Sequence, residues 1–285
     1  MAKVAKPTLQ ERSIRWLYGT ACGRVCLKAL VRPGISKAAG AFLSTPLSKP
    51  LIRSFVRNNG IDLGEYEGAP YRSFNDFFSR RVRDGARPVD GSPDMLVSPA
   101  DSLLTVLPIT AEGRFAIKNT TYTVAELLDD AALATRYTGG FAFVFRLTVT
   151  DYHRYCFPAA GRVLAGARIP GELHTVSPIP GAAIPVYHRN TREYVLLETE
   201  RFGTIVCMEV GAMLVGRIVN EPVSGPVEKG QEKGHFAFGG STVVLLVEPG
   251  HATVPPEYLA GDEVPIRYGQ TVAIIKAADV MVAVD

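Results

Sequence analysis

The stretch Phe238-Gly-Gly-Ser-Thr-Val-Val-Leu-Leu-Val247 decides the fold of this chain. Its last five residues are a continuous run of valine and leucine, which predicts a buried strand. The two glycines before Ser241 predict a tight turn that leads into this strand. The same glycines give the Ser241 hydroxyl unobstructed access to the carbonyl of Gly240. The stretch is therefore typical of a turn, but it also allows a side chain to attack its own main chain.

Other strands are predicted on both sides of this stretch. β-rich runs separated by turns or short polar breaks occur at Leu103–Leu107, Phe141–Val149, Tyr194–Thr199, Thr204–Glu209, Thr271–Lys276 and Val280–Val284. One short helix is predicted between them, at Val124–Leu133. Runs of strands that follow a helical segment indicate an α+β fold. We expect a helical N-terminal region (1–90) packed on a mainly antiparallel β catalytic domain (91–285).

The first eighty residues have the pattern of helices. Apolar side chains recur at helical spacing, with basic residues turned away from them, at Ile14, Leu17, Tyr18, Ala21 and Val25. Thr45-Pro46 predicts the start of a further helix, which Asn58-Asn59-Gly60 ends. Ser73 is the predicted cap of a short helix at Phe74–Phe78, with Asp76 as a partner like that of a capping box.

Residues 1–60 contain eleven basic side chains and one acidic side chain, so this segment carries +10 although the whole chain carries +3. Such a segment indicates an anionic partner surface, either membrane or nucleic acid. We expect a membrane and no nucleic acid, because the aromatic residues here lie in apolar stripes and are not interleaved as base-stacking positions. A solvated helix face packed on a core is the alternative that the pattern leaves open.

The membrane contact is expected to be peripheral. No apolar run approaches the ~18 residues that a spanning helix needs, and the N-terminal residues lack the hydrophobic core of a secretory signal. The four cysteines form no Cys-x-x-Cys pair, so we expect reduced thiols and no metal site. These features favour the cytoplasmic side of the cell membrane.

Three polar positions in the β domain offer an acid, a base and a nucleophile. Asp101 lies in a proline turn before a strand, His153 follows a strongly apolar strand, and Ser241 opens another strand. This is the set of groups that activates a serine. A serine hydrolase is disfavoured because the chain has no Gly-x-Ser-x-Gly elbow and Ser241 precedes a strand instead of a helix. A turn aspartate and a structural histidine remain the alternatives for the first two residues.

An ordered set of motifs runs nearly end to end through the chain. They are Tyr71–Arg80, Gly85–Asp90, Ser98–Asp101, Asp151–Arg154, His174–Pro178, Asn190–Arg192, Gly211–Gly216, Lys229–Gly234 and Phe236–Thr242. In this order they resemble the phosphatidylserine decarboxylase family. The resemblance implies a proenzyme in which His153, oriented and kept basic by Asp101, deprotonates Ser241, and Ser241 attacks the Gly240 carbonyl.

The resemblance also implies the products and the reaction. Cleavage between Gly240 and Ser241 would give a β chain (1–240) and an α chain (241–285), and Ser241 would become a covalent pyruvoyl cofactor. This group would form a Schiff base with the amine of phosphatidylserine and accept electrons as CO₂ leaves, giving phosphatidylethanolamine. The β/α heterodimer is expected to pair into a dimer of such units.

Some positions depart from the family pattern or remain open. Many members have a second histidine where this chain has Cys156, so either His153 serves alone or Cys156 is a weak proton carrier. Ser177 occupies a position that is commonly asparagine. The candidate substrate-binding residues are His174, Asn190, Arg192 and Lys229, the last two for the lipid phosphate.

Two other functions fit the same sequence. The substrate could be a related serine-headed lipid such as archaetidylserine, which only lipid-specific assays would separate. The chain could also be a lipid-binding protein that keeps the scaffold without cleavage. The second alternative predicts liposome binding without release of CO₂.

Overall fold

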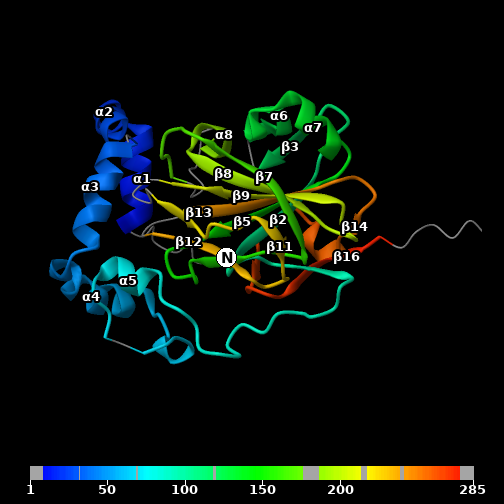
Figure 1. Ribbon diagram of the computed structural model, residues 1–285. Coiled ribbons are helices and arrows are strands. Elements are labelled where there is room, and N and C mark those ends of the chain that lie inside the picture. Colours follow the sequence, from blue (N-terminus) through cyan, green and yellow to red (C-terminus); the bar gives the residue numbers. More distant parts are fainter. Residues whose placement is uncertain are drawn as a thin grey trace, which may run out of the picture.

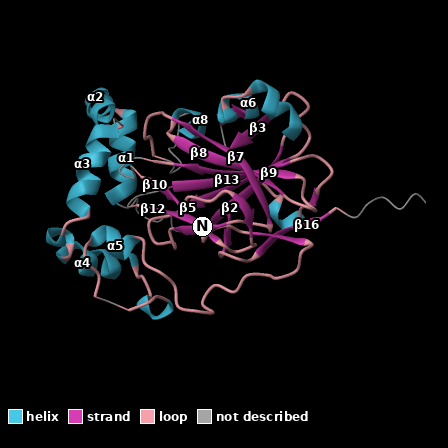
Figure 2. Cartoon of the chain, viewed as in Figure 1, coloured by secondary structure: helices cyan, strands magenta, loops and turns pink. Residues whose placement is uncertain are grey.

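The computed structural model describes residues 9–31, 33–68, 70–117, 120–175, 186–212, 217–237 and 241–276. Within these ranges, helices make up most of the first eighty residues and antiparallel strands dominate the rest (Figures 1 and 2). The predicted α+β class is therefore confirmed. The strands predicted in the described residues occur within two residues of their expected ends, and Val280–Val284 lies outside the described residues.

The N-terminal helices stand along one side of the β region in Figure 1. They are α1 (Leu9–Gly19), α2 (Ala21–Leu30), α3 (Pro33–Leu43), α4 (Pro50–Asn59) and α5 (Phe74–Phe78). The predicted start at Pro46 is wrong for α4: Pro46 opens a single 3₁₀ turn, and Pro50 occupies the first position of the helix. Gly60 ends α4 in the left-handed conformation, and the Ser73 hydroxyl caps α5 by accepting the Asp76 N–H, as predicted.

The helix predicted at Val124–Leu133 is two helices, α6 (Val124–Leu128) and α7 (Ala131–Ala134). Asp129 between them has a φ of 54°, which a continuing helix cannot adopt. The carboxylate of Asp130 then accepts the N–H of Leu133 and caps α7. A third short helix, α8 (Val186–Arg189), precedes β8.

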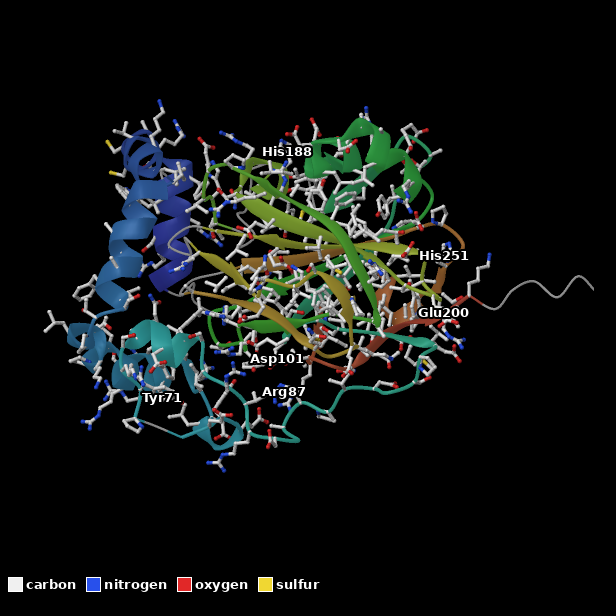
Figure 3. The ribbon with its side chains drawn as sticks, in the orientation of Figure 1. Tyr71, Arg87, Asp101, His188, Glu200 and His251 are labelled. Carbon is white, nitrogen blue, oxygen red and sulfur yellow. The ribbon has the colours of Figure 1, made fainter. Side chains whose placement is uncertain are left out.

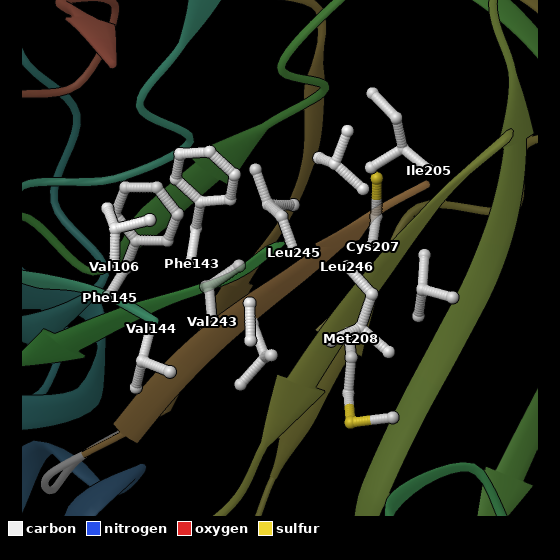
Figure 4. Close-up of a cluster of buried hydrophobic side chains, with 14 of the residues drawn as sticks. Val106, Phe143, Val144, Phe145, Ile205, Cys207, Met208, Val243, Leu245 and Leu246 are labelled. Carbon is white, nitrogen blue, oxygen red and sulfur yellow. The ribbon is translucent and has the colours of Figure 1, made fainter. Parts of the chain in front are cut away.

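In the part of the chain that the structure describes, the main sheet has eight antiparallel strands. Across the sheet they are β11 (Gly225–Val227), β7 (Gly161–Ile169), β8 (Arg192–Glu198), β9 (Thr204–Val210), β13 (Ser241–Val247), β5 (Phe141–Leu147), β2 (Ser102–Pro108) and β15 (Val264–Ile266). All seven residues of β13 are buried, because β5 and β9 flank it and other elements cover both faces. The unbroken apolar run of β13 reflects this central position. Figure 4 shows its side chains packed against those of β5 and β9.

Three smaller sheets make up the rest of the β structure among the described residues. They are β10 (Ile218–Asn220), β12 (Glu232–Phe236) and β6 (Arg154–Cys156); β1 (Met95–Val97), β16 (Thr271–Ile275) and β14 (Ala252–Thr253); and β3 (Arg114–Ile117) with β4 (Thr120–Thr123). Between β12 and the main sheet, the Lys233 ammonium donates to the buried Glu209 carboxylate at 2.5 Å. Gly234 is required nearby, because a Cβ there would meet the Val219 carbonyl at 2.3 Å.

The helical and β regions have separate apolar clusters. Leu43, Phe74, Phe77 and Phe78 form one cluster, and Tyr18, Leu27 and Val31 form another, apart from the large cluster of the sheets. The division at residue 90 stays a prediction. Among the described helices, each is too short or too polar to cross a bilayer.

Candidate active site

The three predicted catalytic residues lie at or beyond the ends of three neighbouring strands. Asp101 directly precedes β2, Ser241 is the first residue of β13, and His153 follows the end of β5. Strand β5 lies between the other two and is antiparallel to both, so the starts of β2 and β13 meet the end of β5. Ser241 is directly opposite Leu147, the last residue of β5. The sheet therefore gathers the three positions at one edge.

Ser241 is completely buried, and its hydroxyl has no hydrogen-bond partner among the described residues. Gly240, the other half of the predicted cleavage site, lies outside the described residues. A buried hydroxyl without a partner loses its hydration without compensation, so it calls for a functional or structural reason. A nucleophile held next to its own peptide bond is one such reason.

His153 is also completely buried, and its ring orientation is fixed by the main chain. Nδ1 lies 2.8 Å from the carbonyl oxygen of Asp151. A carbonyl only accepts hydrogen bonds, so Nδ1 carries the hydrogen of the neutral ring and Nε2 carries the lone pair. The ring packs on Phe78 of α5, with centroids 4.0 Å apart. The Phe236 N–H donates to the carbonyl oxygen of His153 at 2.9 Å, which ties β12 to the same position.

Asp101 is paired with Arg87 instead of the histidine. Figure 3 labels Asp101 and Arg87. Arg87 donates to it through Nε at 2.9 Å and Nη2 at 2.7 Å, and the N–H of Tyr268 donates at 2.8 Å. The hydrogen bonds of the described residues include none between Asp101 and His153. The main-chain carbonyl of Asp151, and not the Asp101 side chain, orients the His153 ring. A part for Asp101 in the chemistry stays a prediction. The sequence analysis did not predict the contact of Arg87 with Asp101, although Arg87 lies in the Gly85–Asp90 motif.

Cys156 is unsuited to act as a base. The residue is buried in β6, and this burial raises the pKa of its thiol to about 12. The thiol is therefore protonated at neutral pH, and a thiol in that state can only donate a proton. This excludes the thiol as the base at neutral pH, and a part for Cys156 as a weak proton carrier stays a prediction.

Asp151 is a candidate functional residue that the sequence reasoning did not single out. Its carboxylate accepts the N–H of Thr148 at 2.6 Å, and its own N–H donates to the Thr148 carbonyl at 3.1 Å. These two bonds close the turn between β5 and His153. Burial, and to a lesser extent the charge of Asp101, raises the pKa of the Asp151 carboxyl to about 6. Its place beside the histidine in the Asp151–Arg154 motif was the available signal.

The raised pKa of Asp151 predicts a measurable pH dependence of stability. Below its ordinary value of 3.8 the carboxyl is protonated in both states, whereas between about 4 and 6 only the unfolded state ionises readily. The free energy of unfolding of the parent therefore falls as the pH rises from about 4 to about 6, because ionisation stabilises the unfolded state. We expect the free energy of unfolding of Asp151→Asn, taken relative to that of the parent, to be about 2 kcal/mol larger at pH 7 than at pH 4. Urea unfolding in a Ser241→Ala background measures this, and an equal difference at both pH values would contradict it.

The candidate substrate-binding residues His174 and Asn190 are hydrogen-bonded to each other. The Asn190 amide oxygen accepts the His174 N–H at 2.9 Å, and its nitrogen donates to the carbonyls of His174 and Gly211. The His174 ring contacts Glu172 through Nε2 and the Tyr18 hydroxyl of α1 through Nδ1. This cluster connects an N-terminal helix to the end of β9 beside Ser241.

Arg192 and Lys229 donate to main-chain carbonyls. Arg192 is buried and bonds the carbonyls of Glu126 and Leu127 at the end of α6, with a further bond to His188. The Lys229 ammonium donates to the carbonyls of Ser92 and Met95. Through these contacts both side chains connect main-chain segments of the fold. Binding of a phosphate by either residue stays a prediction that the described geometry does not support.

Comparison with known proteins identifies the family. A family model described as phosphatidylserine decarboxylase matches residues 74–274, which include Asp101, His153 and Ser241. The chain belongs to this decarboxylase family. It is 41% identical over 264 residues to phosphatidylserine decarboxylase proenzyme 2 of Clostridium acetobutylicum, covering 91% of this chain and 90% of the relative.

Two other relatives give the same result. The proenzymes of Ruminiclostridium cellulolyticum and Fusobacterium nucleatum are 39% and 37% identical, over 82% and 87% of this chain and 80% and 85% of their own lengths. The decarboxylase family is one of carboxy-lyases, so the predicted enzyme class is confirmed. Across the described ranges, no group of histidine, cysteine and carboxylate side chains is arranged to hold a metal ion.

Proposed function

We propose that this chain decarboxylates phosphatidylserine after cutting itself between Gly240 and Ser241. The observation that carries the proposal is the buried Ser241 hydroxyl, which has no hydrogen-bond partner within the described ranges and lies at the sheet edge where Asp101 and His153 also lie. The relatives' name, phosphatidylserine decarboxylase proenzyme, supports both the substrate and the existence of a precursor. The product would be phosphatidylethanolamine, a step of phospholipid biosynthesis.

In the proposed cleavage, His153 acts as the general base through Nε2. It takes the Ser241 proton as Oγ bonds to the Gly240 carbonyl carbon, and the C–N bond breaks as the nitrogen takes a proton. The resulting ester eliminates as a base takes the Cα proton of residue 241, which leaves a carboxylate on Gly240 and a dehydrated residue 241. Addition of water and loss of ammonia then give the pyruvoyl group, so every atom is supplied by the chain and water.

The residues present suit a pyruvoyl group at position 241. The Ser241 hydroxyl has no hydrogen-bond partner among the described residues and is enclosed in the apolar core. Its conversion to a pyruvoyl group therefore breaks few polar contacts. The group supplies an electron sink that side chains alone do not offer. His153 lies at the same sheet edge and is our candidate to hold and return the proton that replaces CO₂.

The N-terminal region is proposed to lie on an anionic membrane. Lys49, which directly precedes helix α4, and Arg53 and Arg57 within it are exposed, and the nearby apolar side chains of Leu47 and Leu51 are 78% and 45% exposed. Basic residues next to exposed apolar ones suit a leaflet of negatively charged lipid. We accordingly propose a peripheral location on the cytoplasmic side of the cell membrane, and a dimer of cleaved units.

Removing the α4 charges should weaken vesicle binding. Each basic residue near an anionic surface contributes about 1 kcal/mol, so K49Q/R53Q/R57Q should lose about 3 kcal/mol, or roughly a hundredfold in partitioning. Sedimentation with phosphatidylserine-containing vesicles at low salt measures the loss. The matched control is R162Q/R168Q/R201Q, which removes three exposed charges from the β region. Equal losses in both triple variants would contradict the assignment of α4.

The whole proposal is tested on purified protein. Intact mass should show the fragments 1–240 and 241–285, the second without its N-terminal amine nitrogen, and phosphatidylserine vesicles should release CO₂. Vesicles of archaetidylserine, assayed in parallel, decide between the two lipids. An intact chain that binds vesicles and releases no CO₂ would instead support the lipid-binding alternative.

A further inference from the structure

Arg80 is a buried cation between the helical region and the turn that precedes His153. It exposes 3% of its surface, and its guanidinium carbon lies 4.1 Å from the ring centre of Tyr66 and 4.8 Å from that of Phe77. Both rings are themselves buried. Arginine stacked on aromatic faces gains cation–π attraction, which lowers the cost of its burial without neutralising its charge.

The polar contacts of Arg80 are few and long. Nη1 donates to the Phe77 carbonyl and Nη2 to the Thr150 carbonyl, both at 3.4 Å, and Nε is buried without a partner among the described residues. None of the ion pairs within the described ranges includes Arg80, whereas the buried Arg87 contacts two carboxylates. A buried, unpaired charge is costly, and planar donors that are only loosely engaged suit a bidentate anion.

The position of this cation relates it to the candidate active site. The carbonyl that accepts from Nη2 belongs to Thr150, inside the turn that Thr148 and Asp151 close before His153. Phe78, two positions before Arg80, packs on the His153 ring. Ser79 and Thr150, the neighbour of Arg80 in the chain and the residue that accepts from its Nη2, are half-buried. A ligand at this edge would have its reacting group near His153.

We propose that the Arg80 guanidinium binds an oxyanion of the serine phospholipid headgroup, either its phosphate or its carboxylate. This inference rests on the proposed function, because it identifies the lipid as the source of the anion. Displacement of the two long carbonyl contacts by a phosphate or carboxylate would give Arg80 charge-assisted bonds, which it does not make with any described residue. In this proposal Arg80 binds the lipid anion, a role for which the sequence analysis had named Arg192 and Lys229.

Calorimetry with soluble headgroups tests the proposal. The protein is first treated with borohydride, which reduces any carbonyl at residue 241 and prevents turnover. Glycerophosphoserine should bind about tenfold more weakly to Arg80→Lys, which keeps the charge but loses the planar fork. Glycerophosphoethanolamine and free serine separate the two anions: the ligand that retains the contacted group shows the same loss. The matched control is Arg81→Lys, at an exposed residue that pairs with Glu232.

Equal glycerophosphoserine affinity in the parent and in Arg80→Lys would overturn the inference. If Arg80→Lys does not fold, a crystal structure of the parent with glycerophosphoserine decides, since an anion away from Arg80 would also overturn it. Failure of the proposed function has a different signature, namely an uncut chain without CO₂ release. Headgroup binding is measured independently of both cleavage and turnover.

Discussion

Ser241→Ala should leave the chain as one uncut species of 285 residues and abolish decarboxylation. The alanine offers no oxygen to attack the Gly240 carbonyl and no precursor for a pyruvoyl group. Without an electron sink the enzyme loses the main source of its rate enhancement, which in enzymes amounts to roughly 8–23 kcal/mol of barrier. Intact mass and CO₂ release on phosphatidylserine vesicles measure the two losses.

Thr242 provides the matched control for this substitution. It is the next residue along β13, is equally buried and also bears a hydroxyl. Thr242→Val should still give the fragments 1–240 and 241–285, because its side chain points to the opposite face of the sheet. Efficient cleavage in Ser241→Ala, or cleavage at another bond in the parent, would refute the assignment of the nucleophile.

His153→Gln should slow self-cleavage by about 10²–10⁴-fold, the usual contribution of a general base. Glutamine keeps a donor for the Asp151 carbonyl but has no lone-pair nitrogen of suitable basicity to take the Ser241 proton. The half-time of precursor decay, followed by gel after synthesis in vitro, measures the effect. The control is His251→Gln, since His251 follows the far end of β13 (Figure 3).

Two results would count against His153 as the base. One is a His153→Gln precursor that decays as fast as the parent. The other is equal slowing in His251→Gln, which would indicate a general effect of histidine loss on folding. Thermal unfolding of both variants in the Ser241→Ala background separates an effect on cleavage from an effect on stability, because every chain is then uncut.

The sheet was largely predictable because it depends on local pattern. The buried run at Val243–Val247 and the strand at Phe141–Leu147 are apolar over most of their length, and such runs have few alternatives to a central strand. Helix boundaries were less predictable. Thr45-Pro46 has the pattern of a helix start, but Pro50 has no N–H to donate to the Pro46 carbonyl, so the continuous helix α4 begins only at Pro50.

The partners within the candidate site were not predictable. Asp101 and Arg87 lie in separate motifs, and nothing local indicates that the carboxylate pairs with this guanidinium and not with His153. The orientation of His153 depends on a main-chain carbonyl, which every residue has and which therefore leaves no mark in the sequence. Arg80 resembles many surface arginines until its burial is known.

The sequence by itself determined the fold class, the family motifs and the candidate nucleophile, because strand pattern and residue type are properties of short segments. Only the tertiary structure decided that β2, β5 and β13 bring their three polar positions to one edge, and which charges are buried with partners. The physical reason is that pairing, burial and desolvation depend on residues far apart in the chain, which meet only when the sheet has formed.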